Sequence, residues 1–548
     1  MRNLFLATSL TLLATAACND SVGDLVDPPV LKVTSPQRSL IQDKAGLVTV
    51  TGTVAPNDSG ALIKKVTVNN VPAAVAADGT FTASIQVKPG AMLIHTEAVD
   101  EAGGKATDTR SVEAGQLRAP SANIENAVTM AVSKPAFARI ADAAGTMIEG
   151  VDMAALLAPM NPLMHSGDES GEDCLFARLY VDNFKMSNAT ITLVPVNGGL
   201  AFSAKLDNVD IPGRARYAVA CADGSNNVRV TASSVLVKGT LVITPDGMKG
   251  FKTDLAGETV QITGLNISAS GIPGTVLDMI PLDTLIAKAA PLAAKLFMGP
   301  MMNKALGGLS GPQTLDVLGK QVTVQVDPSD IAFDTDGGLI TLDMKMLIGG
   351  TENSKGFIFT DNGIPTMDPG NGLEVGLADD LANNVVSQLV ATGLLNLHMP
   401  AEGGTFDGTE IAMTSPPMIS ADPADGKMRL VLPDMMSTFT LQGTPVGRAA
   451  INATVDLKVM PANNGYGIAV ELGKPEIHAD VLDDIENQTT LADEDLGKAV
   501  EITLNSQIAT ISALLGGIPL PSLPAGLQMK DLSITSDDGY VMMKGALE

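Results

Sequence analysis

The stretch GLEVGLADDLANNVVSQLVATGLLN, residues 372–396, decides the fold class that the sequence predicts. Aliphatic residues recur every four positions through it, which places them on one side of an α-helix. These residues are Leu377, Leu381, Val385 and Leu389. Asp379 and Asp380 stand in the first turn, where the partial positive charge of a helix N-terminus favours carboxylates. We therefore expect a long helix with a broad aliphatic stripe.

Three further stretches have helical spacing. The first begins after Ser121 and continues past Pro135, the second covers 275–306 and the third covers 493–515. Their apolar positions are Ile124, Val128, Val132, Phe137, Ile140, Ala144 and Ile148; Leu285, Ala289, Leu292 and Leu296; and Leu496, Val500, Leu504, Ile508, Ile511 and Leu515. The spacing predicts one long helix at each place.

Strands are predicted between these helices. Runs of strand-forming residues bounded by turn signals lie at 179–272, 321–347, 427–476 and 527–544. The order helix, strands, helix, strands thus occurs twice, although residue identity does not visibly repeat. This predicts an α+β fold with two units, at 119–350 and 370–548.

Residues 30–113 have another pattern, in which short strands alternate with turn residues at a spacing of roughly 8–12 positions. The runs are VTVTGTVAPNDSGALIKKVTVNN (48–70), ADGTFTASIQV (77–87) and IHTEAVDEAGGKAT (94–107). They resemble bacterial immunoglobulin-like (Ig-like) domains, including the one appended to glucodextranases. The resemblance implies an all-β sandwich, which we interpret as a spacer in preference to a ligand-binding module.

The first 18 residues, MRNLFLATSLTLLATAAC, have a positive residue, a short apolar segment and small residues before Cys18. This resembles a bacterial lipoprotein signal, which implies lipidation of Cys18 and a short tether at 19–29. Ordinary secretion with cleavage nearby is the alternative. Beyond residue 18 no uncharged apolar run of about 18 residues is present, so no membrane span is expected. We expect an outer-membrane lipoprotein of a bacterial cell envelope, on either membrane face.

With Cys18 lipidated, Cys174 and Cys221 remain as an even pair in an oxidising compartment. A disulfide between them is favoured over free thiols. Zinc is less favoured, because these cysteines and the four scattered His residues lack ligand spacing.

The composition bears on the interior and on partners. The chain is 45% hydrophobic but has no Trp, 13 Phe and 4 Tyr, whereas it has 26 Met. An aliphatic, Met-rich wall suits a tunnel for acyl chains, since Met adapts to irregular partners; an ordinary filled core remains the alternative. With 35 Lys and Arg against 61 Asp and Glu, nucleic acid is not an expected partner.

Three segments carry a resemblance to a family. Residues 372–396 resemble the opening of the C-terminal barrel of the bactericidal/permeability-increasing protein and lipid-transfer family, the tubular lipid-binding (TULIP) superfamily. Residues 516–545, GGIPLPSLPAGLQMKDLSITSDDGYVMMKG, resemble its closing segment, and 271–308 its second N-terminal helix. The resemblance implies two tandem barrels, each with a wrapped antiparallel sheet and long helices that hold a phospholipid-like ligand.

The resemblance also assigns lipid-binding residues by position. They are Leu285, Ala289, Leu292 and Leu296 in the N-terminal barrel, and Leu381, Val385 and Leu389 in the C-terminal barrel. Relatives that bind lipopolysaccharide carry a basic tip, whereas residues 371–548 contain 24 Asp and Glu against 8 Lys and Arg. A neutral or zwitterionic lipid is therefore the expected ligand. A structural or adhesive surface lipoprotein without lipid is the alternative function.

No catalytic motif is found, so an enzyme is not expected, and neither a cofactor nor a protein partner is implied. His165 lies in the polar run HSGDESGEDC, which we interpret as a solvated loop. Asp327, Asp330, Asp334 and Asp336 could ligate calcium, but a hairpin turn at 334–338 explains the last two. A sugar-active enzyme is disfavoured, because aromatic residues that could stack on sugars are scarce.

Overall fold

A computed structural model of the chain describes most of the predicted strands and two of the predicted helices. The described residues are 28–58, 60–149, 155, 158–168, 175–245, 247, 250–274, 276, 313–317, 320–392, 408–422, 427–461, 467–484, 518–519 and 527–547. Two compact units are distinguished. The first contains Met1–Pro36, Val48–Ile85 and His95–Asp108; the second contains Gln37–Leu47, Gln86–Ile94 and Thr109–Glu548. The lipoprotein signal and Cys18 lie outside the described residues.

The strands predicted within 30–113 are present. One sheet has the order β1-β3-β7-β6, and another has the order β2-β9-β8-β4-β5. The bounds are β1 Val30–Ser35, β2 Leu40–Gln42, β3 Gly46–Ala55, β4 Ile63–Val68, β5 Val71–Pro72, β6 Ala74–Val75, β7 Thr80–Val87, β8 Gly90–Asp100 and β9 Lys105–Ala114. Along β7 every second residue is buried, from Phe81 to Val87, as expected of a sheet with one covered face.

A seven-stranded antiparallel sheet, here called the central sheet, joins the two predicted α+β units. Its order is β19-β20-β21-β11-β23-β31-β30. The bounds are β11 Ile124–Ser133, β19 Gln313–Val317, β20 Lys320–Phe333, β21 Gly337–Ile348, β23 Leu373–Ala378, β30 Met529–Asp537 and β31 Tyr540–Leu547. Met130 of β11 lies opposite Val375 of β23, so the two units meet in the middle of one sheet.

Part of the predicted repeat of element order, its first helix and its strands, is visible on both sides of that junction. β11 leads into α1 (Lys134–Glu149), and β23 leads into α5 (Asp379–Ala391). A separate antiparallel sheet follows each helix, and the hairpins β20-β21 and β30-β31 then return to the central sheet. The central sheet thus has matching elements on either side of the β11-β23 pair.

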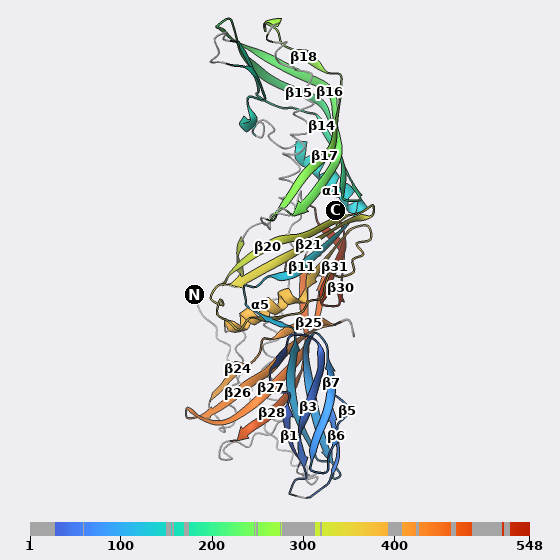
Figure 1. Cartoon of the computed structure of the whole chain (residues 1–548), viewed down its shortest axis with the longest axis vertical. Coiled ribbons are helices and arrows are strands. Elements are labelled where there is room, and N and C mark those ends of the chain that lie inside the picture. Colours follow the sequence, from blue (N-terminus) through green and yellow to red (C-terminus); the bar gives the residue numbers. More distant parts are fainter. Residues whose placement is uncertain are drawn as a thin grey trace, which may run out of the picture. The chain divides into compact units, whose positions relative to one another are not determined.

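The two separate sheets contain the longest strands (Figure 1). The first comprises β12 Met164–Gly167, β13 Phe176–Val181, β14 Asn188–Val196, β15 Gly199–Val219, β16 Ala222–Pro245, β17 Phe251–Thr263 and β18 Asn266–Ser268. The second comprises β24 Gly408–Met413, β25 Met418–Asp422, β26 Lys427–Leu441, β27 Thr444–Pro461, β28 Gly467–Asp484 and β29 Ile518–Pro519. The short strands β10 (Gln116–Arg118) and β22 (Phe357–Phe359) pair with each other, and η1 is a 3₁₀ turn at Ala158–Met160.

One predicted helical segment is wrong. Ile124, Val128 and Val132 belong to strand β11, and α1 begins at Lys134. A spacing of four residues fits a strand as well as a helix, because four is a multiple of the strand period of two. The buried Ala127, Thr129 and Ala131 show the strand period.

Helix α1 begins where the sequence supplies a cap. The Ser133 hydroxyl accepts a hydrogen bond from the Ala136 amide at 3.3 Å, and Pro135 stands in the first turn, where no amide donor is needed. The helix predicted around 377–389 is confirmed as α5, whereas those at 275–306 and 493–515 lie largely or wholly outside the described residues. Within the described part, no helix is long and apolar enough to span a membrane.

Candidate functional site

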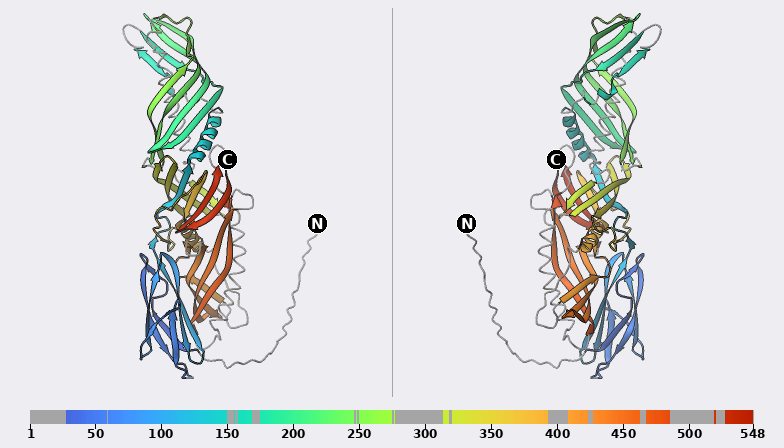
Figure 2. Two further views of the ribbon diagram at one scale, coloured as in Figure 1. Left: turned by 90° about the vertical axis from the view of Figure 1, so that its right-hand side faces the viewer. Right: turned by 90° about the vertical axis from the view of Figure 1, so that its left-hand side faces the viewer.

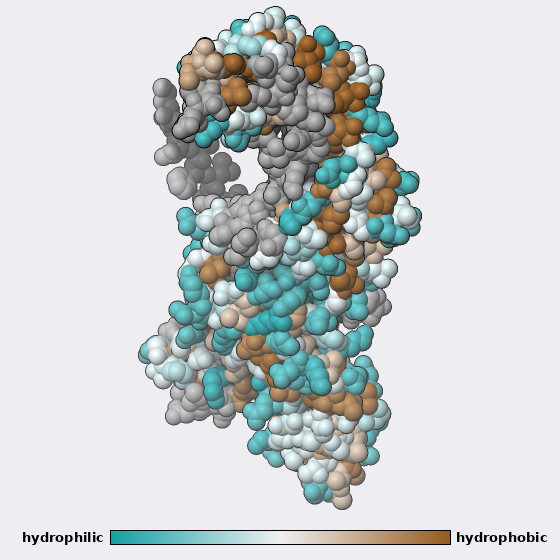
Figure 3. All heavy atoms as spheres, turned by 45° about the horizontal axis from the view of Figure 1, so that its top comes forward, coloured by the Kyte–Doolittle hydropathy of each residue, from teal (hydrophilic) through white to brown (hydrophobic). Residues whose placement is uncertain are grey.

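The sheet around β15 and β16 has one face, here called the inner face, that is apolar along the full length of both strands. Its buried side chains are Leu200, Phe202, Ala204, Val209, Ile211, Ala215 and Tyr217 of β15, and Val228, Val230, Ala232, Val235, Val237, Leu241 and Ile243 of β16. No charged residue is among them. The opposite face carries exposed ion pairs, such as Arg229 with Asp210 at 2.8 Å. Figure 3 shows hydrophobic and hydrophilic residues side by side on one surface of the molecule.

The inner face stays apolar although the alternation of buried and exposed residues shifts by one position in both strands, at paired residues. Buried positions in β15 change from even to odd numbers around Asn208, which has a positive φ of 51°. Those in β16 change between Ala232 and Val235, directly opposite. The pairing register of the two strands is the same on both sides of this shift, so their apolar positions change together and remain on one face. The apolar residues therefore follow the curl of the sheet visible in Figure 2.

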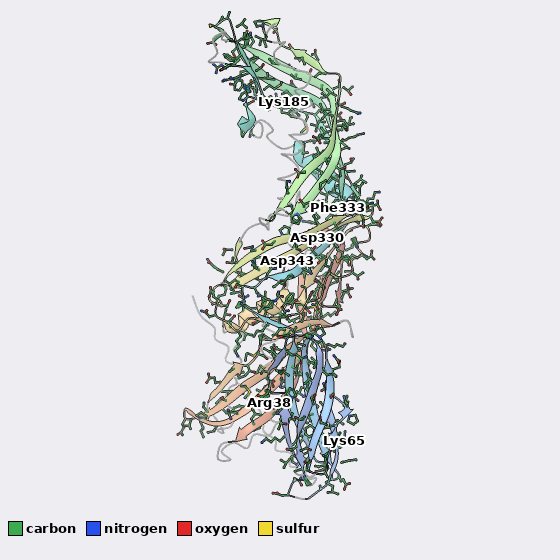
Figure 4. All side chains as sticks on the ribbon, in the orientation of Figure 1. Arg38, Lys65, Lys185, Asp330, Phe333 and Asp343 are labelled. Carbon is green, nitrogen blue, oxygen red and sulfur yellow. The ribbon has the colours of Figure 1, made fainter. Side chains whose placement is uncertain are left out.

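Helix α1 covers part of this sheet. Its buried Phe137, Ala141, Ala144 and Ile148 belong to the same apolar cluster as the inner face. A side chain at Gly145 would place its Cβ 2.7 Å from the Ala189 carbonyl oxygen, so the helix lies directly on β14. Glu149 accepts a hydrogen bond from the Ala189 amide at 3.0 Å, and the Phe137 ring lies 6.0 Å from that of Phe333 (labelled in Figure 4).

The inner face is much longer than this helix. Sixteen residues of α1 span about 24 Å at 1.5 Å per residue. The stretch of β15 from Leu200 to Tyr217 spans about 55 Å at about 3.3 Å per residue. Helix α1 can therefore cover less than half of the inner face.

The lipid-binding residues that the sequence predicted are only partly described. Leu285, Ala289, Leu292 and Leu296 lie outside the described residues. Leu381, Val385 and Leu389 are half-buried on α5. Leu381 packs against a small cluster of Ile124, Ala127, Phe357 and Phe359.

The fully buried face of α5 is polar, which the sequence interpretation missed. Its members are Asp379, Asp380, Asn383, Asn384, Ser387 and Gln388. These residues also recur every four positions, in two rows beside the aliphatic stripe. That spacing was the available sequence signal for a polar face on this helix. A buried polar side chain is costly unless it has hydrogen-bond partners, so this face is a structural attachment surface.

Gln388 shows how the attachment works. Its Oε1 accepts hydrogen bonds from the Ile348 amide at 2.7 Å and from the Thr351 hydroxyl at 2.6 Å. Its Nε2 donates to the Met346 carbonyl at 3.1 Å and to Asn384 Oδ1 at 2.5 Å. The Gln388 side chain thus pairs with backbone groups at the end of β21 and holds the neighbouring Asn384 side chain of α5 in place.

Asp379 and Asp380 attach the first turn of α5 in the same way. The Asp379 carboxylate accepts from the Ala421 amide at 3.0 Å, and that of Asp380 from the Thr360 amide at 3.0 Å. Burial raises the pKa of Asp380 to about 7. Burial and the adjacent Asp380 charge also raise the pKa of Asp379. Desolvation therefore outweighs the helix dipole that the sequence interpretation emphasised.

This pair predicts acid stabilisation of the fold. A carboxyl group whose pKa is higher in the folded than in the unfolded chain stabilises the fold. This stabilisation is complete at a pH below the pKa in the unfolded chain, and it is lost as the pH rises through the pKa in the folded chain. From pH 4 to 7, Asp380 should lower the free energy of unfolding by about 1.4 kcal/mol per pH unit. Urea denaturation monitored by far-UV circular dichroism at several pH values measures this slope.

Two variants isolate that contribution. Asp380→Asn should reduce the slope by the amount expected for one proton, whereas Asp142→Asn, at an exposed position of α1, should leave it unchanged. An undiminished slope in Asp380→Asn would show that the stabilisation comes from other groups.

A second buried polar group, here called the Asp434 cluster, lies within the second unit. Its members are Arg38, Ser39, Thr109, Ser111, Asp434, Asn452 and Asp480. Asp434 stands in a β-bulge of β26, with a φ of 33°, directly after Pro433, a residue that in a strand commonly marks a bulge. Pro433 was therefore a sequence signal for the bulge, whereas no sequence signal identified the partners of Asp434.

Donors surround the fully buried Asp434 carboxylate. They are Arg38 Nη1 at 3.1 Å, the Ser39 amide at 2.6 Å, the Ser111 amide at 3.0 Å and hydroxyl at 2.7 Å, and Asn452 Nδ2 at 3.0 Å. Asp480 Oδ2 accepts from Arg38 Nη2 at 3.1 Å and from the Thr109 amide at 3.0 Å. One guanidinium thus serves two carboxylates; Arg38 is labelled in Figure 4.

The remaining sequence candidates are placed as follows. Cys221 is disulfide-bonded; Cys174 lies outside the described residues, so their pairing stays a prediction. His165 belongs to strand β12 opposite Arg178, which corrects the loop interpretation for this residue. The Asp334 carboxylate accepts from the Asp336 and Gly337 amides, as a hairpin turn requires. No group of three or more potential metal ligands occurs among the described residues.

The comparisons with known proteins concern the N-terminal stretch and the fold. Residues 29–116 match the family model described as glucodextranase, domain B. The crystal structure of lipopolysaccharide binding protein is similar at 14% identity and a TM-score of 0.37, over 78% of this chain and 99% of that chain. The structure of P47 from Clostridium botulinum A2 has 10% identity and a TM-score of 0.20, over 77% and 98%. No curated protein sequence matches the chain.

Proposed function

We propose that the chain is an envelope lipoprotein that binds lipids by enclosing their acyl chains against the inner face of the β12–β18 sheet. The proposal is supported by one observation above all: the inner face is uncharged, mainly aliphatic, and more than twice as long as α1. Burial of each CH₂ group there would stabilise the complex by about 0.8 kcal/mol. The predicted helix at 275–306 would share the same surface, in the two-barrel arrangement that the sequence resemblance implies.

The net charge of the whole chain supports a neutral or zwitterionic headgroup. This charge is −26, and an acidic protein repels anionic glycolipids. Lipidation of Cys18 would hold the protein at the outer membrane. Cys18→Ser should then release the protein from the membrane fraction, and lack of labelled fatty acid on wild-type Cys18 would contradict this part.

Lipid extraction and native mass spectrometry of the purified mature chain test the binding function. Co-purifying phospholipid, or saturable uptake of a fluorescent phosphatidylcholine, is the expected result. Empty protein that also rejects the fluorescent lipid would refute the proposal.

A matched pair of substitutions tests where lipid binds. Val237 is buried on the inner face, and its neighbour Lys238 is exposed on the other face. Val237→Trp should block lipid uptake, whereas Lys238→Trp should not. In a filled core, Val237→Trp would instead chiefly destabilise the fold by about 1–3 kcal/mol, with no ligand to lose.

A structural surface lipoprotein is the second candidate, and the attachment of α5 supports it. That helix holds its buried polar face against strand ends by hydrogen bonds, as a filled structural unit does. Val385→Trp on its half-buried face distinguishes the two functions in the C-terminal half: reduced lipid uptake favours binding there, and unchanged uptake with lower stability favours a structural role.

A further inference from the structure

Glu113 is a buried carboxyl group without hydrogen bonds. It lies at the end of β9, its side chain is inaccessible to solvent, and neither carboxyl oxygen has a hydrogen-bond partner. The buried hydroxyl of Ser415 is nearby and is also unpartnered. An ionised carboxylate in such a place loses its hydration without compensation.

The charges around Glu113 add to this cost. Ser111, two residues earlier in β9, donates to Asp434, whose negative charge raises the pKa of Glu113. Arg38 is already shared between Asp434 and Asp480. Lys355 is exposed and donates to the carbonyls of Met413 and Thr414, the residues that precede Ser415. An ionised Glu113 would therefore add a further negative charge that repels the Asp434 carboxylate.

We propose that Glu113, as a neutral carboxylic acid, is a proton-dependent latch that holds residues 37–39 and the end of β9 onto strands β26–β28. The proton gives Glu113 a donor that can reach the Ser415 hydroxyl and removes the third negative charge from the cluster. Loss of the proton weakens the cluster, because it leaves an uncompensated buried charge close enough to the Asp434 carboxylate to repel it.

The direction of the pH effect follows from burial. Burial raises the pKa of Glu113 to about 8, against an ordinary value near 4.5 once the latch opens. The closed latch is therefore most stable below the open-state pKa and weakens as pH rises. The opening constant should increase about tenfold per pH unit between pH 5 and 8 and then level off.

Amide hydrogen exchange at the latch measures this constant. The informative amides are those of Ser39, Thr109 and Ser111, since each donates to Asp434 or Asp480. After correction for intrinsic exchange, the opening constant of the wild-type protein should increase about tenfold per pH unit between pH 5 and 8. The opening constant of Glu113→Gln should not increase. Glu101→Gln, at an exposed site, is the matched control and should behave as wild type.

Equal pH dependence in wild type and Glu113→Gln, or no dependence in wild type, would overturn the proposal. Infrared spectroscopy of wild-type protein with isotopically labelled glutamate provides a test that needs no variant. One protonated glutamic acid should remain at pH 7 and ionise by pH 9. Complete ionisation of every glutamate at pH 6 would equally overturn the latch.

Discussion

Replacing Asp434 with Ala should lower the free energy of unfolding by about 3–5 kcal/mol, the range found when one partner of a buried ion pair is removed. The substitution leaves the Arg38 guanidinium with Asp480 as its remaining carboxylate in the cluster. It also removes the acceptor of the Ser39 and Ser111 amides and of Asn452 Nδ2. Urea denaturation monitored by far-UV circular dichroism is the measurement, since the chain has no Trp.

Asp456→Ala is the matched control for Asp434→Ala. Asp456 also pairs with an arginine, Arg429, at 3.1 Å, but both side chains are more than one third exposed. Exposed pairs contribute about 0–1 kcal/mol because solvent screens the charges. If both variants lose similar stability, the Asp434 cluster is not a stabilising centre.

Gln388→Ala should destabilise the chain by about 3 kcal/mol or more, because it leaves several buried polar groups unsatisfied at about 1–3 kcal/mol each. The Ile348 amide, the Thr351 hydroxyl and the Met346 carbonyl lose a partner together. The single proton of the Thr351 hydroxyl has the Ile348 carbonyl, at 2.7 Å, as an alternative acceptor, which limits the total. Thermal and urea denaturation measure the loss.

Gln321→Ala provides the comparison for Gln388→Ala. Gln321 is an exposed glutamine on β20, so its truncation should change the free energy of unfolding by less than about 0.5 kcal/mol. A small effect of Gln388→Ala would mean that water replaces the lost side chain, and that the polar face of α5 is not closed to solvent.

Local patterns in the sequence predicted local structure well. The turn at Asp334 is confirmed because its carboxylate needs only the amides of the next residues. The existence of α5 is confirmed for a similar reason: its spacing and its acidic first turn act within one helix. The error at β11 shows the limit of such patterns, because a spacing of four residues suits both a strand and a helix.

The buried side of α5 depended on distant residues. Aliphatic and polar residues both recur every four positions along this helix, so periodicity could not choose between the two faces. The polar face is buried because the ends of β21, β22 and β25 present amides and carbonyls that need partners. The groups that Asp379, Asp380 and Gln388 satisfy are remote in sequence, and the sequence therefore could not identify them.

The sequence by itself determined the strand-rich N-terminal stretch, the repeated order of elements, the α5 helix and the aliphatic, acidic composition. Tertiary structure alone decided that β11 pairs with β23 in one sheet, that the inner face outreaches α1, and that Arg38 meets Asp434. Propensity and periodicity act over a few residues, whereas these three features join segments tens to hundreds of residues apart. Such contacts form only when the whole chain pairs its remaining hydrogen-bonding groups and buries its apolar faces.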